Sequence, residues 1–254
     1  MRLVFDIQSL QSASRLRGIG RYTQSLIAAL NQNGQSHEVI LLLNGSIDAP
    51  QDSLITELET LLPGAECVVC HLPGPSAAHD SRNLTRQAAA ELIREAFICE
   101  LQPDLVHVFS AMEGYGDNVV TSLARLHTDY PVTATFYDLI PLLNPQEYLG
   151  ANHAFKYHYS ERIDNLKRAD GLLAISHFSA GEAAEHLHFP REKISVASLG
   201  PLGPSIAEGV ARDADIAALK AIGVAPEFLL YVGGSDPRKN LPRLVEAWSS
   251  LPQD

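Results

Sequence analysis

Leu3-Val4-Phe5-Asp6-Ile7 is a short apolar run of the kind that forms a buried β-strand, and Arg17-Gly18-Ile19-Gly20-Arg21-Tyr22 follows it after a loop. A helical pattern then occupies residues 19–32. Glycines between a strand and a helix let the backbone approach a ligand, and the N-terminus of the helix offers unpaired N–H groups. This stretch predicts the first strand, turn and helix of an α/β fold.

The same alternation continues along most of the chain. Further β-rich apolar runs lie at residues 38–43, 66–70, 105–109, 132–136, 172–175 and 194–197. Helical patterns lie at residues 52–62, 83–101, 118–128, 151–168 and 178–188. Because neighbouring parallel strands need a crossover connection, the alternation predicts a Rossmann-like, doubly wound parallel sheet with helices on both faces.

The pattern changes after residue 200. We predict a first domain at residues 1–200, a connector at 201–226 with a short helical stretch around 216–222, and a second α/β domain beginning at 227. The second piece holds a strand pattern at 228–232 and a helical pattern at 241–251. About 30 residues cannot build a core of their own, so we expect this second domain to be truncated.

The composition argues against several classes of function. Acidic residues outnumber basic ones by 30 to 19, for a net charge of −11, and no basic block occurs, which disfavours a nucleic-acid partner. Neither a signal peptide nor an apolar run of roughly 20 residues is present, so we expect a cytoplasmic protein without a transmembrane segment. Three cysteines form no disulfide framework, and we expect no metal at Cys67-Val68-Val69-Cys70-His71, because residues three apart on a strand point to opposite faces.

Three segments follow predicted strands, at the edge where open α/β sheets bind ligands. The turn at Gly18-Ile19-Gly20 suits a diphosphate, and a plain flexible turn is an equally good interpretation. Asp138 either orients a sugar hydroxyl or caps the next turn, and the local sequence favours the cap. Lys239 opposes the dipole of the helix that follows it, which indicates an anion there unless the side chain is simply solvated.

Four segments occur in a fixed order along nearly the whole chain. They are Gly18-Ile19-Gly20-Arg21-Tyr22, Asp138-Leu139-Ile140-Pro141-Leu142, Ile175-Ser176-His177-Phe178-Ser179-Ala180, and Leu230-Tyr231-Val232-Gly233-Gly234-Ser235-Asp236-Pro237-Arg238-Lys239-Asn240. In this combination the chain resembles the retaining GT-B glycosyltransferases of family four. The segment Met112-Glu113-Gly114-Tyr115-Gly116-Asp117-Asn118-Val119-Val120 resembles the branch that acts on bacterial O-antigen and related polysaccharides, often mannosyltransferases.

The resemblance implies a GT-B N-terminal domain that holds the acceptor and a second domain that holds a nucleotide sugar. The residues that it implies for catalysis are Asp138, Tyr137 and Lys239. Those implied for donor binding are Gly18, Ile19, Gly20, Arg21, Ser176, Arg238 and Lys239. Those implied for acceptor binding are Arg17, Tyr22, Glu113 and Tyr115.

The chain departs from the family pattern in three places. Tyr137 stands where many relatives have histidine, and Gly234 stands where many have arginine. A phenol cannot carry a positive charge, so neutralisation of the phosphates falls more heavily on Lys239. The paired-glutamate motif that binds the donor would lie beyond residue 254.

The sequence therefore predicts a retaining glycosyltransferase that moves a hexose to a growing bacterial surface polysaccharide such as O-antigen, with mannose from GDP-mannose as the favoured donor. The nucleotide sugar is a co-substrate, no separate cofactor is expected, and the acceptor is a glycan or lipid-linked glycan. Peripheral contact with the inner face of the membrane is compatible with this function. The alternative is a catalytically incomplete module that binds the acceptor or a partner, and we expect the 254-residue chain alone to be inactive. An NAD-dependent oxidoreductase is disfavoured because the third glycine of the dinucleotide fingerprint is missing.

Overall fold

The computed structural model describes residues 1–32, 37–47, 51–126, 129–200, 213–224 and 228–251. The chain divides into two compact units, which we call unit 1 (Met1–Gly203) and unit 2 (Pro204–Asp254). Most of the predicted connector at 201–226 lies outside the described residues, and its described part contains helix α8 (Asp213–Ala221).

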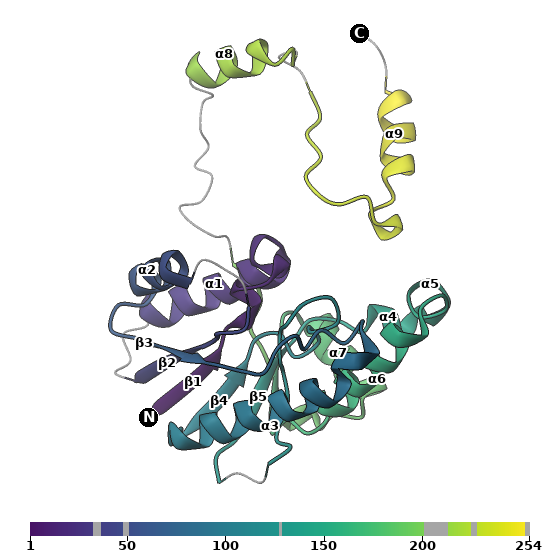
Figure 1. Ribbon diagram of the computed structural model, residues 1–254. Coiled ribbons are helices and arrows are strands. Elements are labelled where there is room, and N and C mark those ends of the chain that lie inside the picture. The colour runs from purple at the N-terminus through teal and green to yellow at the C-terminus, as the bar shows by residue number, and fades with distance from the viewer. Residues whose placement is uncertain (33–36, 48–50, 127–128, 201–212, 225–227, 252–254) are drawn as a thin grey trace. The chain divides into compact units, whose positions relative to one another are not determined.

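A seven-stranded parallel sheet forms the centre of unit 1 (Figure 1). Its strands are β1 (Arg2–Asp6), β2 (Glu38–Asn44), β3 (Glu66–Cys70), β4 (Leu105–Val108), β5 (Val132–Phe136), β6 (Gly171–Ala174) and β7 (Ile194–Val196). The strand order is β3-β2-β1-β4-β5-β6-β7, and Leu3 of β1 is in register with Val39 of β2 and Leu105 of β4. This order confirms the predicted Rossmann-like, doubly wound sheet. From β1 the strands follow one another in chain order toward β3 on one side and from β4 toward β7 on the other, so the order of the strands reverses between β1 and β4.

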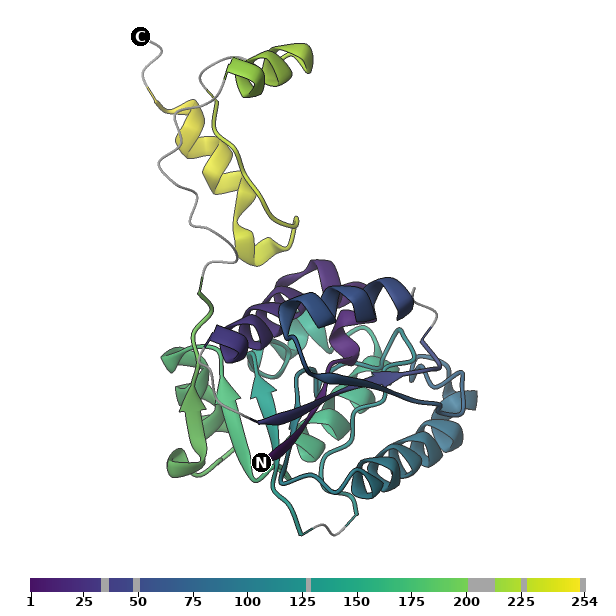
Figure 2. The same ribbon diagram turned by 90° about the vertical axis from the view of Figure 1, so that its left-hand side faces the viewer.

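Helices cover both faces of the sheet (Figures 1 and 2). They are α1 (Gly18–Gln32), α2 (Gln51–Leu61), α3 (Leu84–Glu100), α4 (Ile140–Leu143), α5 (Pro145–Tyr148), α6 (His153–Leu166) and α7 (His177–His186). One apolar cluster joins the sheet to α1 and α2 through side chains such as Ile27 and Leu58. The other joins it to α3, α6 and α7 through side chains such as Ala90, Ile163 and Ala183. Burial of these two clusters is the main stabilising contribution to the fold.

The prediction of a helix at residues 118–128 is wrong for residues 118–126, and 127–128 lie outside the described residues. Side chains from elsewhere in unit 1 take up the backbone groups that a helix would have paired. The Gln8 side chain donates to Val120 O at 2.8 Å and accepts from Val120 N at 2.9 Å. Asn165 accepts from Leu123 N at 2.9 Å and donates to Thr121 O at 2.8 Å. Because these bonds satisfy the buried backbone, the segment needs no helical ladder.

A buried ion pair supports the same segment. Arg94 of α3 pairs with Asp6 at the end of β1, and both side chains are buried. Arg94 Nη1 also donates to Ser122 O at 3.1 Å, while Asp6 Oδ1 accepts from Gln8 N at 3.1 Å. Since each charge is both paired and hydrogen-bonded, the pair can lie in the core without an uncompensated charge.

Unit 2 contains α8, a 3-10 helix at Pro237–Lys239 and helix α9 (Leu241–Ser249). The prediction of a strand at residues 228–232 is wrong, because these residues have no regular secondary structure. A strand needs the backbone of a neighbouring strand, and the described part of unit 2 offers none. Leu230 and Val232 are accordingly 71% and 78% exposed.

Candidate functional site

The candidate site of unit 1 lies where the sheet order reverses, at the carboxyl ends of β1 and β4. The segment between β1 and α1 supplies Ser12 and, from a 3-10 helix at Ala13–Leu16, Ser14; the loop after β4 supplies Ser110 and Glu113. Ser12 Oγ donates to Glu113 Oε1 at 3.3 Å. In doubly wound folds ligands bind in the crevice at this reversal of strand order, so this is where the topology predicts a site.

Glu113 is a mostly buried carboxylate surrounded by hydroxyl groups. Burial raises its pKa, and the negative charge of Asp117 adds to the increase, whereas the hydroxyls of Ser14, Ser110 and Ser12 oppose it. Glu113 Oε2 and Ser110 Oγ are buried and have no hydrogen bond of regular geometry to any described residue. The neighbouring hydroxyls therefore supply the polar surroundings that a buried carboxylate needs.

Tyr137 follows β5 and extends this group of polar side chains. Burial raises the pKa of Tyr137 well above its usual range and the negative charge of Glu113 adds to the increase, whereas a hydrogen bond with the Thr23 side chain opposes it, so the hydroxyl stays protonated at neutral pH. The hydroxyl makes no regular hydrogen bond within the described part of the chain. Tyr137 therefore brings a protonated phenol, next to Thr23, to the same edge of the sheet as Glu113.

Tyr22 supports Tyr137 from helix α1. The two rings meet edge to face, with their centroids 5.7 Å apart. Tyr22 is buried, and its hydroxyl donates to Ala197 O at 2.9 Å. The Tyr22 ring thus packs against the Tyr137 ring, and the Tyr22 hydroxyl is already hydrogen-bonded. Contact of Tyr22 with an acceptor stays a prediction.

Asp138 and Ser176 both cap local backbone. Asp138 is exposed, and its Oδ1 accepts from Ile140 N at 3.1 Å, which confirms the cap that the local sequence favours. Ser176 is the N-cap of α7 and accepts from Ser179 N at 3.0 Å. Ser179 Oγ in turn donates to Tyr137 O at 2.6 Å, so the start of α7 helps to hold Tyr137. Contact of Asp138 or Ser176 with a sugar or phosphate stays a prediction.

The two glycines of the first turn have different surroundings. A Cβ on Gly20 would lie 2.3 Å from Arg15 O, whereas a Cβ on Gly18 would meet no atom within 4 Å. Gly20, in the first turn of α1, therefore permits the backbone of Arg15 in the 3-10 helix at Ala13–Leu16 to approach α1 closely, and Gly18 faces open space. The N–H groups of Gly18, Ile19 and Gly20 have no acceptor among the residues that the structure describes, as is usual at a helix N-terminus.

Arginines surround this N-terminus. Arg17 and Arg21 are exposed and make no ion pair with any described residue. Arg15 instead pairs with Glu57 of α2. Two free cations next to unpaired N–H groups form a surface that favours an anion.

Tyr115, predicted to bind the acceptor, lies in an aromatic group at the start of α6. Its ring is 5.0 Å from that of Phe155 and 5.6 Å from that of His158, measured between centroids. Its hydroxyl is hydrogen-bonded to Asn152, the N-cap of α6. These contacts hold the loop after β4 against α6.

The predicted residues of unit 2 lie in the turn before α9. Arg238 forms an ion pair with Asp236, with Nε and Oδ1 2.9 Å apart. Lys239 is exposed and makes no ion pair within the described ranges. Of the two adjacent cations, Lys239 is thus the one available to an anion.

Sequence reasoning pointed to Ser110, as a polar residue at the end of a strand pattern, but missed Ser12 and Ser14. Ser12 and Ser14 lie six and eight positions beyond the end of β1, after a 3-10 helix at Gln8–Leu10, so position next to a strand gave no signal for them. Serine is also too common in loops for its presence alone to single them out. Only the fold shows that they surround Glu113.

No group of three or more His, Cys, Asp or Glu side chains that could hold a metal ion occurs within the described residues. Burial raises the pKa of the Cys70 thiol to about 11. Among the described helices, none is long and apolar enough to cross a membrane.

Comparison with known proteins shows which proteins this chain resembles. The model of the family described as Glycosyltransferase Family 4 matches residues 16–200. The serotype-specific mannosyltransferase WbdA of Escherichia coli is 31% identical over 257 residues, which cover 100% of this chain and 30% of WbdA. A second WbdA protein from Escherichia coli is 31% identical over 229 residues, covering 89% of this chain and 28% of its own length. The chain thus spans under a third of the length of the curated relatives it matches.

Solved structures with a similar fold include a glycosyltransferase from Rickettsia africae ESF-5, at 14% identity and a TM-score of 0.41, covering 99% of this chain and 50% of that one. UGT89C1 from Arabidopsis thaliana shows 12% identity and a TM-score of 0.47, covering 89% of this chain and 55% of its own.

Proposed function

Because the chain belongs to glycosyltransferase family 4, we propose that the protein transfers a hexose to a growing bacterial surface polysaccharide such as O-antigen. The donor is GDP-mannose, the transferred sugar is mannose, and the configuration at its anomeric carbon is retained. The name of its WbdA relatives, mannosyltransferase, supports the choice of sugar.

One observation carries the proposal. A carboxylate (Glu113), a hydroxyl (Ser110) and a phenol (Tyr137) follow β4 and β5 at the carboxyl edge of the sheet. A carboxylate accepts hydrogen bonds and a phenol donates them, so the group matches the hydroxyls of a sugar. Glu113 would hold an acceptor hydroxyl, and Tyr137 would donate to the acceptor or to the transferred sugar.

The leaving group in this reaction is a nucleoside diphosphate, and its developing charge must be stabilised. The N–H groups at Gly18-Ile19-Gly20, with Arg17 and Arg21 beside them, supply one positively polarised surface. Lys239 supplies another in unit 2. Such stabilisation is electrostatic and needs no nucleophile from the protein. The nucleotide sugar serves as co-substrate.

The Lys239→Ala variant tests this role. In the natural full-length protein we expect it to lower the kcat for transfer from radiolabelled GDP-mannose by at least about tenfold, the effect of losing one charge-assisted hydrogen bond. Lys220→Ala, an exposed lysine on α8, is the matched control and should leave kcat unchanged. Equal rates for the two variants would count against the proposed role of Lys239.

The Glu113→Gln variant tests the acceptor site. We expect transfer to a lipid-linked glycan to fall at least about tenfold, while Glu100→Gln, an exposed glutamate at the end of α3, retains full activity. Since burial raises the pKa of Glu113 above 4.5, ionisation at pH 7 costs folding free energy that glutamine does not incur. The variant should therefore unfold at the same or higher urea concentration at pH 7, and this gain should vanish below about pH 4.5.

A second candidate function is a module that binds the acceptor without transferring sugar. Two observations favour it: Tyr137 stands where many family members have histidine, and Arg238 is paired with Asp236. Titration calorimetry with GDP-mannose, run beside the transfer assay, separates the two functions. Glycan binding with neither donor binding nor transfer by the natural full-length protein would support the binding module.

A further inference from the structure

A carboxylate on α2 holds the segment that leads into the first helix. Glu57 Oε2 pairs with Arg15 of the 3-10 helix at Ala13–Leu16, and Glu57 Oε1 accepts from Gln24 Nε2 of α1 at 2.7 Å. Helices α1 and α2 lie side by side on one face of the sheet, so Glu57 reaches both partners from a neighbouring helix (Figures 1 and 2). One side chain thus joins three segments of unit 1.

The segment that Glu57 holds makes a tight corner. A Cβ on Gly20 would lie 2.3 Å from Arg15 O, so the 3-10 helix touches the first turn of α1. Arg17 alone separates the two helices, and its backbone is extended, with a φ of −108° and a ψ of −174°. Arg17 N donates to Ser14 O at 2.9 Å. The orientation of the 3-10 helix therefore fixes where Arg17 and the start of α1 lie.

This corner carries the groups that the proposed function assigns to the diphosphate. We call residues 17–21 the anion-binding turn. Arg17, Gly18 and Arg21 are exposed in it, whereas the guanidinium of Arg15 is already engaged by Glu57. Because an anion is bound by several donors at once, its affinity depends on how well those donors are held in place before it binds.

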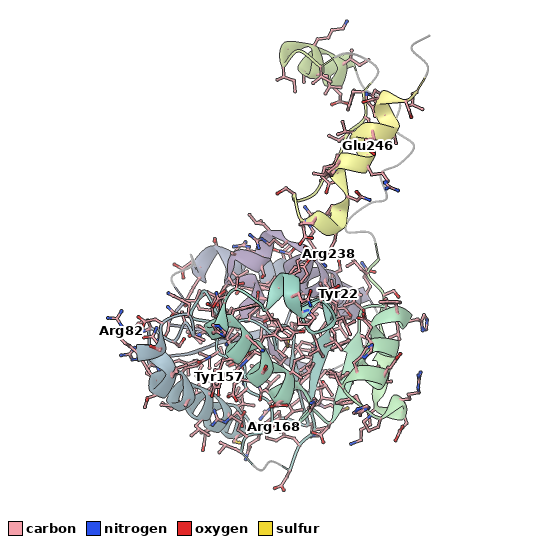
Figure 3. The ribbon with its side chains drawn as sticks, turned by 90° about the vertical axis from the view of Figure 1, so that its right-hand side faces the viewer. Tyr22, Arg82, Tyr157, Arg168, Arg238 and Glu246 are labelled. Atoms are coloured by element: carbon pink, nitrogen blue, oxygen red, sulfur yellow. The ribbon has the colours of Figure 1, made fainter. Side chains whose placement is uncertain are left out.

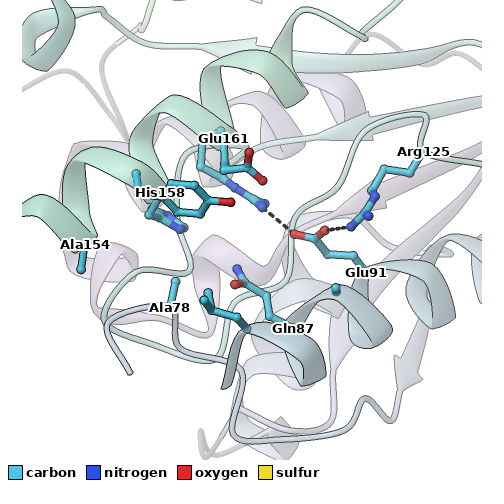
Figure 4. Close-up of a pocket in the computed structure, with 11 residues that line it drawn as sticks. Ala78, Gln87, Glu91, Arg125, Ala154, His158 and Glu161 are labelled. Atoms are coloured by element: carbon cyan, nitrogen blue, oxygen red, sulfur yellow. Dashed lines mark hydrogen bonds and ion pairs between the residues drawn. The ribbon is translucent and has the colours of Figure 1, made fainter. Parts of the chain in front are cut away.

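A second bridging carboxylate shows the contrast with a buried, structural bridge. Glu91 of α3 is 4% exposed and pairs with Arg162 of α6 and with Arg125 (Figure 4). The Glu57 bridge lies nearer the surface, with side chains 36% exposed at Glu57 and 28% at Arg15. Ion pairs this exposed contribute little to stability, so the Glu57 bridge can be removed without unfolding the protein.

We propose that Glu57 is a positioning residue for the anion-binding turn. By joining Arg15 to Gln24, it fixes the corner before α1, so that Arg17, Arg21 and the first N–H groups of α1 are in place before a diphosphate binds. The inference rests on the proposed function, since that function brings a nucleoside diphosphate to this turn. A carboxylate would repel the ligand, so Glu57 acts through the turn and not by contact.

The Glu57→Gln variant separates positioning from charge. Glutamine has nearly the same size and can still accept from Gln24, but it forms no ion pair with Arg15. Coulomb attraction alone predicts tighter binding of an anion, because a negative charge is lost and Arg15 is set free. Positioning predicts weaker binding, because the corner must then be ordered at the moment of binding. The sign of the change in affinity decides between the two.

The measurement is a titration of the 254-residue chain with inorganic pyrophosphate, followed by nuclear magnetic resonance of the backbone amides. We expect saturable shifts at residues 17–22 in the wild-type chain. Glu57→Gln should weaken this binding at least about threefold. Glu38→Gln is the matched control, because it removes another partly exposed ion pair, with Arg2, and should leave the affinity unchanged.

Gln24→Ala is a second test, because it removes the α1 side of the bridge without changing any charge. Positioning predicts weaker pyrophosphate binding for this variant, whereas charge alone predicts no change. Arg17→Gln should also weaken binding. Its control is Arg168→Gln, which removes an exposed cation that lies well apart from Tyr22 of α1 (Figure 3).

The amide spectrum of each variant checks its folding. The proposal is overturned if Glu57→Gln or Gln24→Ala binds pyrophosphate as tightly as the wild-type chain, if Glu38→Gln weakens binding equally, or if no saturable shifts appear at residues 17–22. The titration involves no sugar transfer. Weaker binding by Glu57→Gln in a protein that transfers no sugar would therefore refute the proposed function alone, and transfer without pyrophosphate binding would refute the positioning role alone.

Discussion

At the scale of single residues, the two glycines of the first turn have separable roles. A Cβ on Gly20 would lie 2.3 Å from Arg15 O, and one on Gly18 would contact nothing. We expect Gly20→Ala to lower the free energy of unfolding by about 1–3 kcal/mol, because the 3-10 helix that carries Arg15 must move away from α1. Gly18→Ala should change it by less than about 1 kcal/mol. Urea denaturation of both variants checks this, and equal losses would contradict the packing role of Gly20.

At the scale of elements, one glutamine holds the segment that replaces the predicted helix. The Gln8 side chain bonds both Val120 N and Val120 O, and it also donates to Asp6. Gln8→Ala leaves these buried groups unpaired, and each such group costs about 1–3 kcal/mol. We expect the free energy of unfolding to fall by about 2–5 kcal/mol.

Gln24→Ala is the control for this element, because Gln24 of α1 is only partly buried and bonds Glu57. It should cost less than about 1 kcal/mol. Hydrogen exchange gives a second measurement: the amides of Val120 and Leu123 should lose protection in Gln8→Ala and keep it in Gln24→Ala. Retained protection of Val120 in Gln8→Ala would show that the segment does not depend on this side chain.

At the scale of the whole molecule, two buried histidines make stability depend on pH. Burial lowers the pKa of His107 and of His158 from 6.5 to about 4. Between these values the unfolded chain binds protons that the folded protein does not, so stability falls as pH drops from 6.5 toward 4. The loss is up to about 3 kcal/mol per group, and the raised pKa of Glu113 offsets part of it at the acid end.

Urea unfolding at several pH values between 7.5 and 4.5 measures this dependence. His107→Asn, which keeps polar atoms near Thr133 and Thr135, should reduce the slope of stability against pH in that window. A slope equal to that of the wild-type chain would mean that His107 does not titrate with unfolding.

The distribution of buried residues leads to a further prediction for the whole molecule. Every buried residue in the described part of the chain lies within residues 3–189, and α9 contributes none. A chain of residues 1–203 should therefore unfold with the same free energy as the 254-residue chain, within about 1 kcal/mol. Side-by-side urea titrations check this, and a larger loss would show that unit 2 stabilises unit 1.

The sequence by itself determined the sheet of this protein. The apolar runs that become β1 to β7 are local patterns, because a buried strand is recognised from the residues of that strand alone. The glycines of the first turn of α1 and the polar residues after β4, β5 and β6 were local in the same sense. The cap at Asp138 also followed from its neighbours.

Only the tertiary structure decided how residues distant in the chain meet. Residues 118–126 have a helical pattern, yet Gln8, 112 positions away from Val120, satisfies their backbone instead. Residues 228–232 have a strand pattern, yet they form no strand because the described part of unit 2 offers no neighbouring strand. The hydroxyls around Glu113 likewise depend on long-range packing. Hydrogen bonds and burial between distant residues leave no periodic signal in the sequence, so they appear only when the chain is folded.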